Sequence, residues 1–323
     1  MTPAGSRIDA ARMRELGVVE TPLLRLDHIA PQGRRIYAKA EWHQPTGSVK
    51  DRVAAAMVAS AEADGTLDGP SDLVEPSSGN TGIALARISM LLGHRLTVLV
   101  PDNVSQERLD LLALFGASIV FTPGEEGSNG AVRRAEQRAS ETGETFLHQY
   151  ENLANPRAHE ATTGPEIEWQ LEELGEQAPA AFVATLGTGG TVTGAGRALR
   201  RAFPDIAVVA VEPPVGESIS GLRSMADGYV PPVFDPAMLD GRMLVRTGPS
   251  LVMMRRLAEE EGLFVGPSSG TAVHAAVRRA AALPSGSVVV TVLPDAGWKY
   301  LSTGVFSGTI EGAEEAVAAS TLW

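Results

Sequence analysis

The sequence of 323 residues contains no cysteine, and only three of its 27 Lys and Arg residues are lysines. The absence of cysteine excludes disulfides, thiolate metal sites and a cysteine nucleophile. Lys39, Lys50 and Lys299 are therefore the few side-chain amines available for chemistry. The histidines follow no H-E-x-x-H or similar spacing, which argues against a metal site and favours ordinary surface or core roles for His28, His43, His94, His148, His159 and His274.

Long apolar runs and blocks of like charge are also missing. No apolar run approaches the roughly 18 residues of a membrane span, and the opening MTPAGSRIDAARMRELG lacks the apolar core of a signal peptide. The formal net charge of -12, with an isoelectric point near 5.0, repels phosphate backbones and anionic membrane surfaces. We therefore expect a cytoplasmic protein that binds neither nucleic acid nor a membrane.

The residues that are present suit a large α/β protein. Hydrophobic residues make up 44% of the chain and charged residues 20%, which is enough apolar surface for two domains. Apolar, β-branched runs alternate with segments of helical periodicity, a pattern typical of mainly parallel sheets buried on both faces. Nine candidate strands are too many for one small sheet, so we expect two sheets. These candidates are residues 35–42, 72–77, 96–101, 118–123, 146–150, 181–187, 207–213, 263–268 and 287–294.

Three strand-to-helix junctions are rich in glycine and hydroxyl residues. They read EPSSGNTG at 75–82, TLGTGGTVTG at 185–194 and VGPSSGT at 265–271. Ligands of α/β folds bind where strands end and helices begin. We therefore expect the three junctions to converge on one site.

The segment QPTGSVKDR, residues 44–52, places a cation where a helix begins. Pro45 and Gly47 form a turn, Ser48 is the expected N-cap, and the apolar residues that follow have helical spacing. The helix dipole disfavours an ammonium in the first turn by roughly 0.3–1 kcal/mol. Lys50 is therefore expected to be an amine of lowered pKa that points into a cleft. The alternative is a partly exposed lysine whose charge is offset by Asp51.

The run LGTGGT, residues 186–191, has the character of a phosphate cradle. Its glycines allow close backbone approach, and threonine hydroxyls and helix amides supply donors. A dinucleotide fingerprint would need glycine where Val192 stands, and no P-loop motif occurs. A glycine-rich turn needed only for packing is the alternative. One phosphate site, a lysine of lowered pKa and a dry α/β cleft together indicate pyridoxal phosphate, whose aldehyde forms a Schiff base with an amine.

Six motifs occur in the order found in a known family. They are PTGSVKDR, SSGNTGIALA, QYENLANP with HEATTGPEI, LGTGGT, GPSSGTAV and LPDAGWKYLST. In these motifs the chain resembles the cysteine synthase family of fold-type II pyridoxal-phosphate enzymes, from residue 20 to the C-terminus. The resemblance implies a homodimer with a tryptophan synthase β-like fold of two three-layer α/β/α domains. The smaller, mobile domain would span 46–152, and the larger cofactor-binding domain 1–45 plus 153–323.

The resemblance also implies roles for individual residues. Lys50 would be the Schiff-base lysine and the acid/base at the substrate Cα, and Asn80 would hydrogen-bond the cofactor's ring hydroxyl. Ser268 would face the pyridine nitrogen, where a neutral hydroxyl gives a weaker electron sink than an aspartate. The cofactor phosphate would be held by Gly187, Thr188, Gly189, Gly190 and Thr191. The substrate carboxylate would be bound by Ser77, Ser78, Thr81 and Gln149.

Those carboxylate residues also have simpler interpretations. Hydroxyls and amides that begin the helix after Gly79 form an anion site on physical grounds alone. Each single hydroxyl, Ser78 above all, could instead be an N-cap, and Gln149 could be an ordinary strand-end residue. Gln44 and Ser77 depart from the usual family pattern beside the site. They leave open a specialised β-replacement, for example with a nitrogen nucleophile.

Three further segments, GLRSMADGYVP, DAGWKYLSTG and the terminal LW, resemble the branch of cysteine synthase B that uses O-phosphoserine. In that branch sulfur arrives as a thiocarboxylate on a small ubiquitin-like sulfur-carrier protein. The resemblance makes Arg223 the phosphate-binding residue, because a guanidinium fits a phosphate dianion better than an acetyl ester. By composition alone, Arg223 would be a solvated surface arginine.

The expected activity is therefore β-replacement of O-phospho-L-serine, or less favourably O-acetyl-L-serine, through α-aminoacrylate to L-cysteine. The tail, residues 311–323, ends in Leu322 and Trp323, and an apolar terminus of this kind is expected to dock as a lid over the site. Docking elsewhere on the protein is the alternative. Rival functions are another β-substituted alanine synthase, a serine or threonine dehydratase, and a non-catalytic binding partner.

Overall fold

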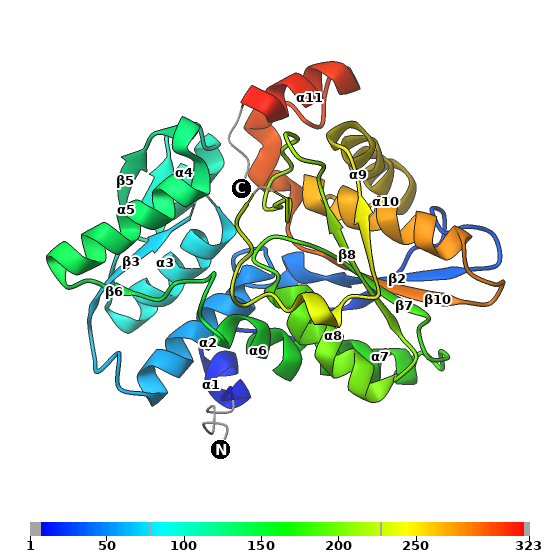
Figure 1. Ribbon diagram of the computed structural model, residues 1–323, viewed down its shortest axis with the longest axis horizontal. Coiled ribbons are helices and arrows are strands. Elements are labelled where there is room, and N and C mark those ends of the chain that lie inside the picture. Colours follow the sequence, from blue (N-terminus) through cyan, green and yellow to red (C-terminus); the bar gives the residue numbers. More distant parts are fainter. Residues whose placement is uncertain (1–7, 78, 227, 320–323) are drawn as a thin grey trace.

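The computed structural model describes residues 8–77, 79–226 and 228–319, which form two β-sheets surrounded by helices (Figure 1). The smaller sheet is wholly parallel, and the larger one is parallel except for β1, which pairs antiparallel with β2. The four-stranded sheet has the order β5 (Ser118–Thr122), β4 (Arg95–Pro101), β3 (Asp72–Pro76), β6 (Thr145–Phe146). The six-stranded sheet has the order β1 (Leu23–Arg25), β2 (Arg35–Ala40), β10 (Val288–Leu293), β7 (Ala181–Thr185), β8 (Ala207–Glu212), β9 (Gly241–Leu244).

Eight of the nine expected strands are present, and one prediction is wrong. The run 263–268 forms only an isolated bridge between Val265 and Ala296, because Gly266 precedes a helix whose first residue is Pro267. Proline at the first helical position is pre-organised for a helix. The short strands β1 and β9 escape a periodicity search because they span three and four residues.

Helices cover both faces of each sheet, so the expected three-layer α/β/α architecture is confirmed. The core on one face of the four-stranded sheet is formed with α2 (Lys50–Ala63), α3 (Asn80–Leu92) and α4 (Gln106–Leu114), beside α1 (Ala10–Glu15). α5 (Gly127–Thr142) packs on the other face. The six-stranded sheet lies between α7 (Thr163–Glu173) with α8 (Gly190–Ala202) and α9 (Thr247–Glu261) with α10 (Pro267–Ala281).

The remaining helices connect these layers. α6 (Ala154–Ala161) packs between α2 and α8, and α11 (Ile310–Ala319) packs against α9. Among the described residues, four 3-10 helices complete the fold: η1 (Glu41–His43), η2 (Gly124–Glu126), η3 (Pro236–Met238) and η4 (Gly297–Thr303). All strands of the four-stranded sheet lie within 72–146, and the other sheet uses residues on both sides of that stretch. A division into two domains and the mobility of the smaller one stay predictions.

Two distant segments meet where α2 begins. Val49 N donates to Pro294 O at 2.8 Å, and Ala296 N donates to Gly47 O at 3.1 Å. Ser48 and Asp295 form an isolated antiparallel β-bridge. These hydrogen bonds attach the start of α2 to the end of β10. Ser48 is not the N-cap that the sequence predicts, because Val49 occupies that position; the Ser48 hydroxyl accepts only a long hydrogen bond, from Lys50 N at 3.4 Å. The backbone that follows β10 therefore holds the residues just before α2 and fixes where Lys50 stands.

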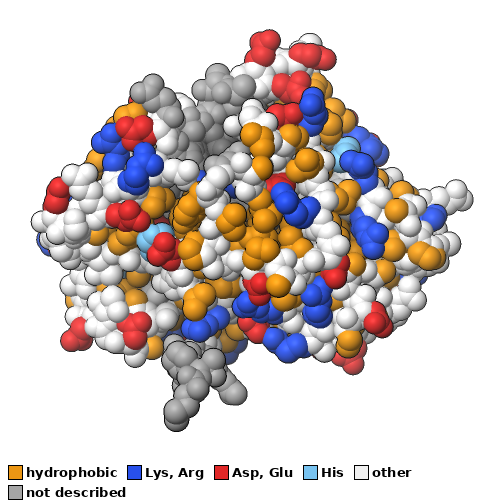
Figure 2. Space-filling view, in the orientation of Figure 1, with side chains coloured by type: hydrophobic (Ala, Val, Ile, Leu, Met, Phe, Trp, Pro, Cys, Tyr) orange, Lys and Arg blue, Asp and Glu red, His pale blue; other side chains and the backbone are white. Residues whose placement is uncertain are grey.

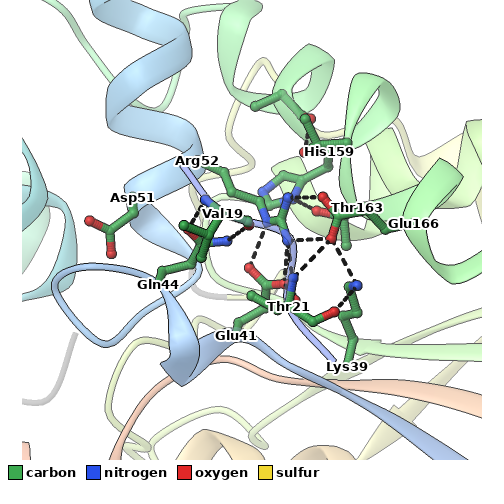
Figure 3. A network of polar contacts seen from close by, with 12 residues as sticks. Val19, Thr21, Lys39, Glu41, Gln44, Asp51, Arg52, His159, Thr163 and Glu166 are labelled. Atoms are coloured by element: carbon green, nitrogen blue, oxygen red, sulfur yellow. Dashed lines mark hydrogen bonds and ion pairs between the residues drawn. The ribbon is translucent and has the colours of Figure 1, made fainter. Parts of the chain in front are cut away.

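A buried network of ion pairs lies on the other side of α2 (Figure 3). Arg52, two residues after Lys50 and thus roughly 200° around the helix, contacts Glu41 at 2.8 Å and Glu166 at 2.6 Å. Lys39 Nζ contacts Glu166 at 2.8 Å, and Thr21 Oγ1 donates to Glu41 at 2.7 Å. Burial by itself would raise the pKa of Glu41, but the Arg52 guanidinium outweighs burial and holds that pKa below its ordinary value.

Figure 2 shows apolar side chains gathered in the centre of one face, with charged side chains of both signs towards its edge. Within residues 8–77, 79–226 and 228–319, no helix has the length and apolar character to cross a membrane.

Candidate active site

Lys50 stands at the first position of α2 and lines a pocket between the two sheets. Burial lowers the pKa of its ammonium, as the sequence predicts, and the Asp295 carboxylate opposes that shift. Asp51 does not offset the lysine charge, because its carboxylate accepts hydrogen bonds from Thr46 Oγ1 at 2.7 Å and Thr46 N at 3.2 Å. Among the described residues, the Lys50 Nζ has no hydrogen-bond or ion-pair partner. The amine is therefore available to a ligand.

The glycine loop, residues 187–191, adopts a conformation that larger residues would disrupt. Gly189 has a φ of 84°, and a Cβ there would lie 2.5 Å from the Phe234 Cβ. At Gly190 a Cβ would lie 1.9 Å from Asn155 Oδ1. The loop leads into α8, whose first backbone amides have no partner within the helix. Such a loop can approach a phosphate closely and donate hydrogen bonds to it.

The predicted cofactor residues come together around one pocket of about 540 Å³. An amine and an amide lie beside the same space as the glycine loop, and the Ser268 hydroxyl at the start of α10 also faces it. Gly190 belongs to the same loop. This set of groups fits pyridoxal phosphate, which offers an aldehyde, a ring hydroxyl, a ring nitrogen and one phosphate. The lining residues of the prediction are Lys50, Asn80, Gly187, Thr188, Gly189, Thr191 and Ser268.

An adjoining pocket of about 640 Å³ contains the predicted carboxylate site. Ser77, Thr81 and Gln149 line it together with Lys50. Thr81 Oγ1 donates to Gln149 Oε1 at 2.7 Å, and Ser77 Oγ accepts from Gly82 N at 2.9 Å. Ser77 thus both lines the pocket and caps α3. Ser78 lies outside the described residues, as do Leu322 and Trp323 of the predicted lid.

A buried carboxyl that the sequence does not single out positions Gln149. Both oxygens of Glu75 accept backbone hydrogen bonds, from His148 N at 3.0 Å and Gln149 N at 3.1 Å. Burial raises the pKa of Glu75 to about 8. His148 has a φ of 60°, a left-handed conformation that is uncommon for a residue other than glycine. Glu75 therefore holds the strained turn that directs Gln149 towards the pocket, and this turn ends β6 early.

Arg223 lines the pocket and is half-buried, so it is not a fully solvated surface arginine. Its backbone N donates to Leu186 O at 2.8 Å, which ties it to the start of the glycine loop. The guanidinium carbon lies 5.3 Å from the Tyr150 ring centroid and 5.0 Å from that of Tyr229. Nη2 donates to Asn129 Oδ1 of α5 at 2.7 Å. Aromatic rings on two sides orient the guanidinium in the same pocket as Lys50.

Two charged groups beside Asn80 were missed as site residues. Asn80 Nδ2 donates to Asp295 Oδ2 at 2.7 Å, and Lys299 Nζ donates to Asn80 Oδ1 at 2.6 Å. Both follow β10, so the rule that ligands bind at the carboxyl ends of parallel strands could have identified them. Gln44, which differs from the usual family pattern, has a structural role. Its side chain forms hydrogen bonds with the backbone of Val19 and does not line the pocket.

One buried histidine, His159, contacts the glycine loop. His159 contacts Thr163 Oγ1 at 2.9 Å and Thr191 Oγ1 at 3.2 Å, and burial lowers its pKa well below the ordinary value. It is a neutral, hydrogen-bonded core residue behind the glycine loop. In the part of the chain that the structure describes, no group of three or more His, Asp or Glu side chains is arranged to hold a metal ion.

A fold of two mainly parallel sheets, with an amine, an amide and a glycine loop around one pocket, is that of a fold-type II pyridoxal-phosphate enzyme. Residues 14–295 match the family described as pyridoxal-phosphate dependent enzyme, and the chain belongs to this family. A probable cysteine synthase of Bacillus subtilis is 41% identical over 297 residues, 89% of this chain and 95% of the relative. A cysteine synthase of Staphylococcus aureus is 40% identical over 295 residues, 89% of this chain and 94% of the relative.

Solved structures agree with this assignment. An O-ureido-L-serine synthase superposes with a TM-score of 0.85 at 38% identity, covering 95% of this chain and 98% of the other. An O-acetylserine dependent cystathionine beta-synthase from Helicobacter pylori gives a TM-score of 0.84 at 33% identity, covering 93% and 99%. The chain is thus a cysteine synthase-like enzyme that depends on pyridoxal phosphate.

Proposed function

We propose that this enzyme replaces the phosphate of O-phospho-L-serine with a sulfur nucleophile to give L-cysteine. Pyridoxal phosphate supplies an aldehyde that condenses with an amine and a ring that accepts electron density from the substrate Cα. Lys50 binds the cofactor and carries the proton to and from Cα. Asn80, Ser268 and residues 187–191 hold the cofactor in place.

The other pocket residues orient the substrate. Ser77 and Gln149 donate hydrogen bonds to its carboxylate, and Thr81 does so when its hydroxyl turns away from Gln149 Oε1. Such charge-assisted contacts fix an anion. Ser78 has the same role by resemblance. With the carboxylate fixed, the Cα proton faces Lys50 and the leaving group at Cβ lies within the same pocket. Phosphate leaves from Cβ, and sulfur then bonds to Cβ.

The position of Arg223 is the observation that favours O-phosphoserine over O-acetylserine as the substrate. Its guanidinium lines the same pocket as Lys50 and Gln149, where a group on the substrate Cβ would lie. A planar guanidinium binds a phosphate dianion through two parallel hydrogen bonds, whereas an acetyl ester carries no charge to pair with it. The contact to Asn129 is to a neutral amide oxygen, which a phosphate dianion can outcompete.

Steady-state kinetics with the Arg223→Ala holoenzyme test this choice. Losing one charge-assisted contact is worth about 1.5–3 kcal/mol, so kcat/KM for O-phosphoserine should fall roughly 10- to 150-fold, with a much smaller loss for O-acetylserine. L-cysteine formed from sulfide is the readout. Arg133→Ala is the matched control, because Arg133 is an exposed arginine on the helix that carries Asn129. Equal losses for both substrates would show that Arg223 is structural and would refute the substrate assignment.

Product analysis separates the rival activities. Without a nucleophile, a serine or threonine dehydratase would release pyruvate or 2-oxobutyrate at full rate, whereas a β-replacement enzyme needs the second substrate for turnover. Relatives of this fold include an O-ureido-L-serine synthase and an O-acetylserine dependent cystathionine beta-synthase. Thiols and nitrogen nucleophiles are therefore to be compared with sulfide. If L-cysteine forms more slowly than the product of another nucleophile, the physiological product would be a different β-substituted alanine.

We also propose that the enzyme is a homodimer and accepts sulfur either as sulfide or as a carrier-protein thiocarboxylate. The resemblance of the segment 221–231 to the carrier-dependent branch supports the second donor. Light scattering of the holoenzyme measures the assembly. Turnover with a purified thiocarboxylated carrier, compared with sulfide at equal concentration, measures the donor preference.

A further inference from the structure

A second lysine is completely buried beside the cofactor pocket. Lys299 lies in η4, just after β10, and its side chain has 0% exposure. Its Nζ donates to Asn80 Oδ1 at 2.6 Å and lies 5.3 Å from the Trp298 ring centroid. Burial lowers the pKa of Lys299 to about 8. A buried ammonium is costly unless it is paired and hydrogen-bonded, so its contact with an asparagine calls for an explanation.

The amide of Asn80 is held from both sides. Lys299 offers only donors, so it fixes which side of the amide is the carbonyl. The Asp295 carboxylate accepts at 2.7 Å and fixes which side is the NH₂ group. Asp295 is itself held by Tyr300, whose hydroxyl donates to Oδ2 at 2.6 Å. The second N–H of the Asn80 amide has no hydrogen-bond partner among the described residues, and Asn80 lines the cofactor pocket.

The element that carries Lys299 is anchored to the smaller sheet's helices. Ser302 N and Oγ each donate to the Glu107 carboxylate of α4 at 2.6 Å. Ser105 Oγ donates to the Lys299 carbonyl at 3.3 Å. Lys299 is thus held by its backbone as well as by its amine. A flexible, solvated lysine could not hold an amide in one orientation, whereas this one can.

We propose that Lys299 is a positioning residue that acts through Asn80, locking the amide so that its remaining N–H is directed at the cofactor ring. This role rests on the proposed contact between Asn80 and the cofactor. Lys299 does not line either pocket, so it touches neither cofactor nor substrate. Without its amine, the Asn80 amide is held by Asp295 alone, and the hydrogen bond to the cofactor weakens.

The test measures cofactor affinity, by fluorescence titration of apoenzyme with pyridoxal phosphate, together with the absorption spectrum of the holoenzyme. Lys299→Met removes the donor and keeps the apolar stem. The dissociation constant should rise about 2- to 13-fold, the value of one hydrogen bond, and the absorption maximum should shift. Lys299→Arg restores a cationic donor and should recover the spectrum. Lys299→Gln, one bond shorter than lysine but still polar beside Asp295, serves if the Met variant does not fold.

The decisive comparison uses Asn80→Ala as a second background. Lys299→Met should have no further effect on cofactor affinity there, because its target is gone. Full additivity of the two changes, or an unchanged affinity in Lys299→Met alone, would overturn the role of Lys299. If Asn80→Ala itself leaves affinity and spectrum unchanged, the proposed cofactor contact of Asn80 fails instead, and Lys299 loses its role with it. A loss of thermal stability with unchanged affinity would mark Lys299 as structural only.

Discussion

Lys50 and Arg52 stand two residues apart on one helix, yet they belong to opposite kinds of buried charge. The Arg52 guanidinium forms hydrogen bonds to two carboxylates, Glu41 and Glu166, and its side chain has 0% exposure. Lys50 faces Asp295 with no hydrogen bond from its amine to any described residue. One side of α2 is a completed network (Figure 3). On the other side, the Lys50 amine has no hydrogen-bond partner among the described residues, and a bound ligand would supply one.

The three lysines show what distinguishes the two regions. Burial lowers the pKa of Lys39, Lys50 and Lys299 alike, so a lowered pKa does not by itself mark a catalytic lysine. Lys39 is saturated by Glu166, Gln170 and a backbone carbonyl, and it lines neither pocket of the site. Lys50 lacks such partners and lines both pockets. Incomplete pairing at a pocket wall is therefore the more informative signal of function.

The largest expected effect is on activity, at Lys50. Lys50→Ala removes both the cofactor linkage and the acid–base group, and loss of the latter alone should lower kcat by about 10²–10⁴-fold. Its stability should not fall, because a buried amine without a partner does not stabilise the fold. Borohydride reduction of the wild-type holoenzyme followed by peptide mapping should label Lys50. Label on Lys39 or Lys299 would contradict this assignment.

Arg52 should give the reverse result. Arg52→Met leaves the buried Glu41 carboxylate without its main partner, and breaking a buried pair in this way costs about 3–5 kcal/mol. Urea unfolding of the apoenzyme measures the loss. The fraction that remains folded should bind cofactor with nearly unchanged affinity. A weakened cofactor site with intact stability would remove the distinction between the two sides of α2.

The smallest effect concerns the pH dependence of stability at Lys299. Its pKa of about 8 lies below the ordinary 10.5, because burial outweighs the attraction of Asp295 and Asp51, while Arg108 and Lys50 oppose its charge. Below pH 8 the amine is charged in both states and burial destabilises the fold. Between pH 8 and 10.5 the unfolded state binds more protons, so stability rises with pH.

Urea unfolding of wild-type and Lys299→Met apoenzyme at several pH values tests this sign. The stability of the wild type relative to the variant should increase from pH 8 to 10 and stay flat from pH 6 to 7.5. Subtracting the two curves cancels the other titrating groups. Parallel curves across the whole range would mean that Lys299 is not buried in a charged state at neutral pH.

Much of the fold could be predicted from the sequence, because its parallel strands are nearly continuous apolar runs. The run 287–294 and the core strand β10 illustrate this, since every residue of β10 is buried. The run 263–268 misled because a short apolar run does not reveal whether Pro267 ends a strand or begins a helix. Ser48 misled for another reason, because α2 begins one residue later, where Val49 N donates to the Pro294 carbonyl 245 residues away.

For the site, motif spacing brought together the lysine, the asparagine and the glycine loop, whose positions follow local strand-to-helix turns. Asp295 and Glu75 were not singled out, and Lys299 was noted only as one of three amines, because the importance of these residues depends on contacts between distant segments. Glu75 reads as an ordinary strand residue until its two bonds to the backbone of 148–149 are seen. Residues that act within local motifs can thus be predicted from a sequence, whereas the residues that orient them through long-range contacts cannot.

The order of strands in the larger sheet has a consequence for biosynthesis. β10 lies between β2 and β7 although it comes last among the strands of the described residues, and Val289 pairs with Ile36. At 5–20 residues per second, a ribosome needs on the order of 10–50 s to synthesise the stretch between these two residues. During that time β2 can pair only with β1, because its other neighbour β10 has not been made. The strands of the four-stranded sheet are all synthesised earlier and can pair with one another. Because the residues after β10 also anchor the start of α2, the nascent enzyme acquires its active-site lysine geometry only once β10 and these residues have been synthesised.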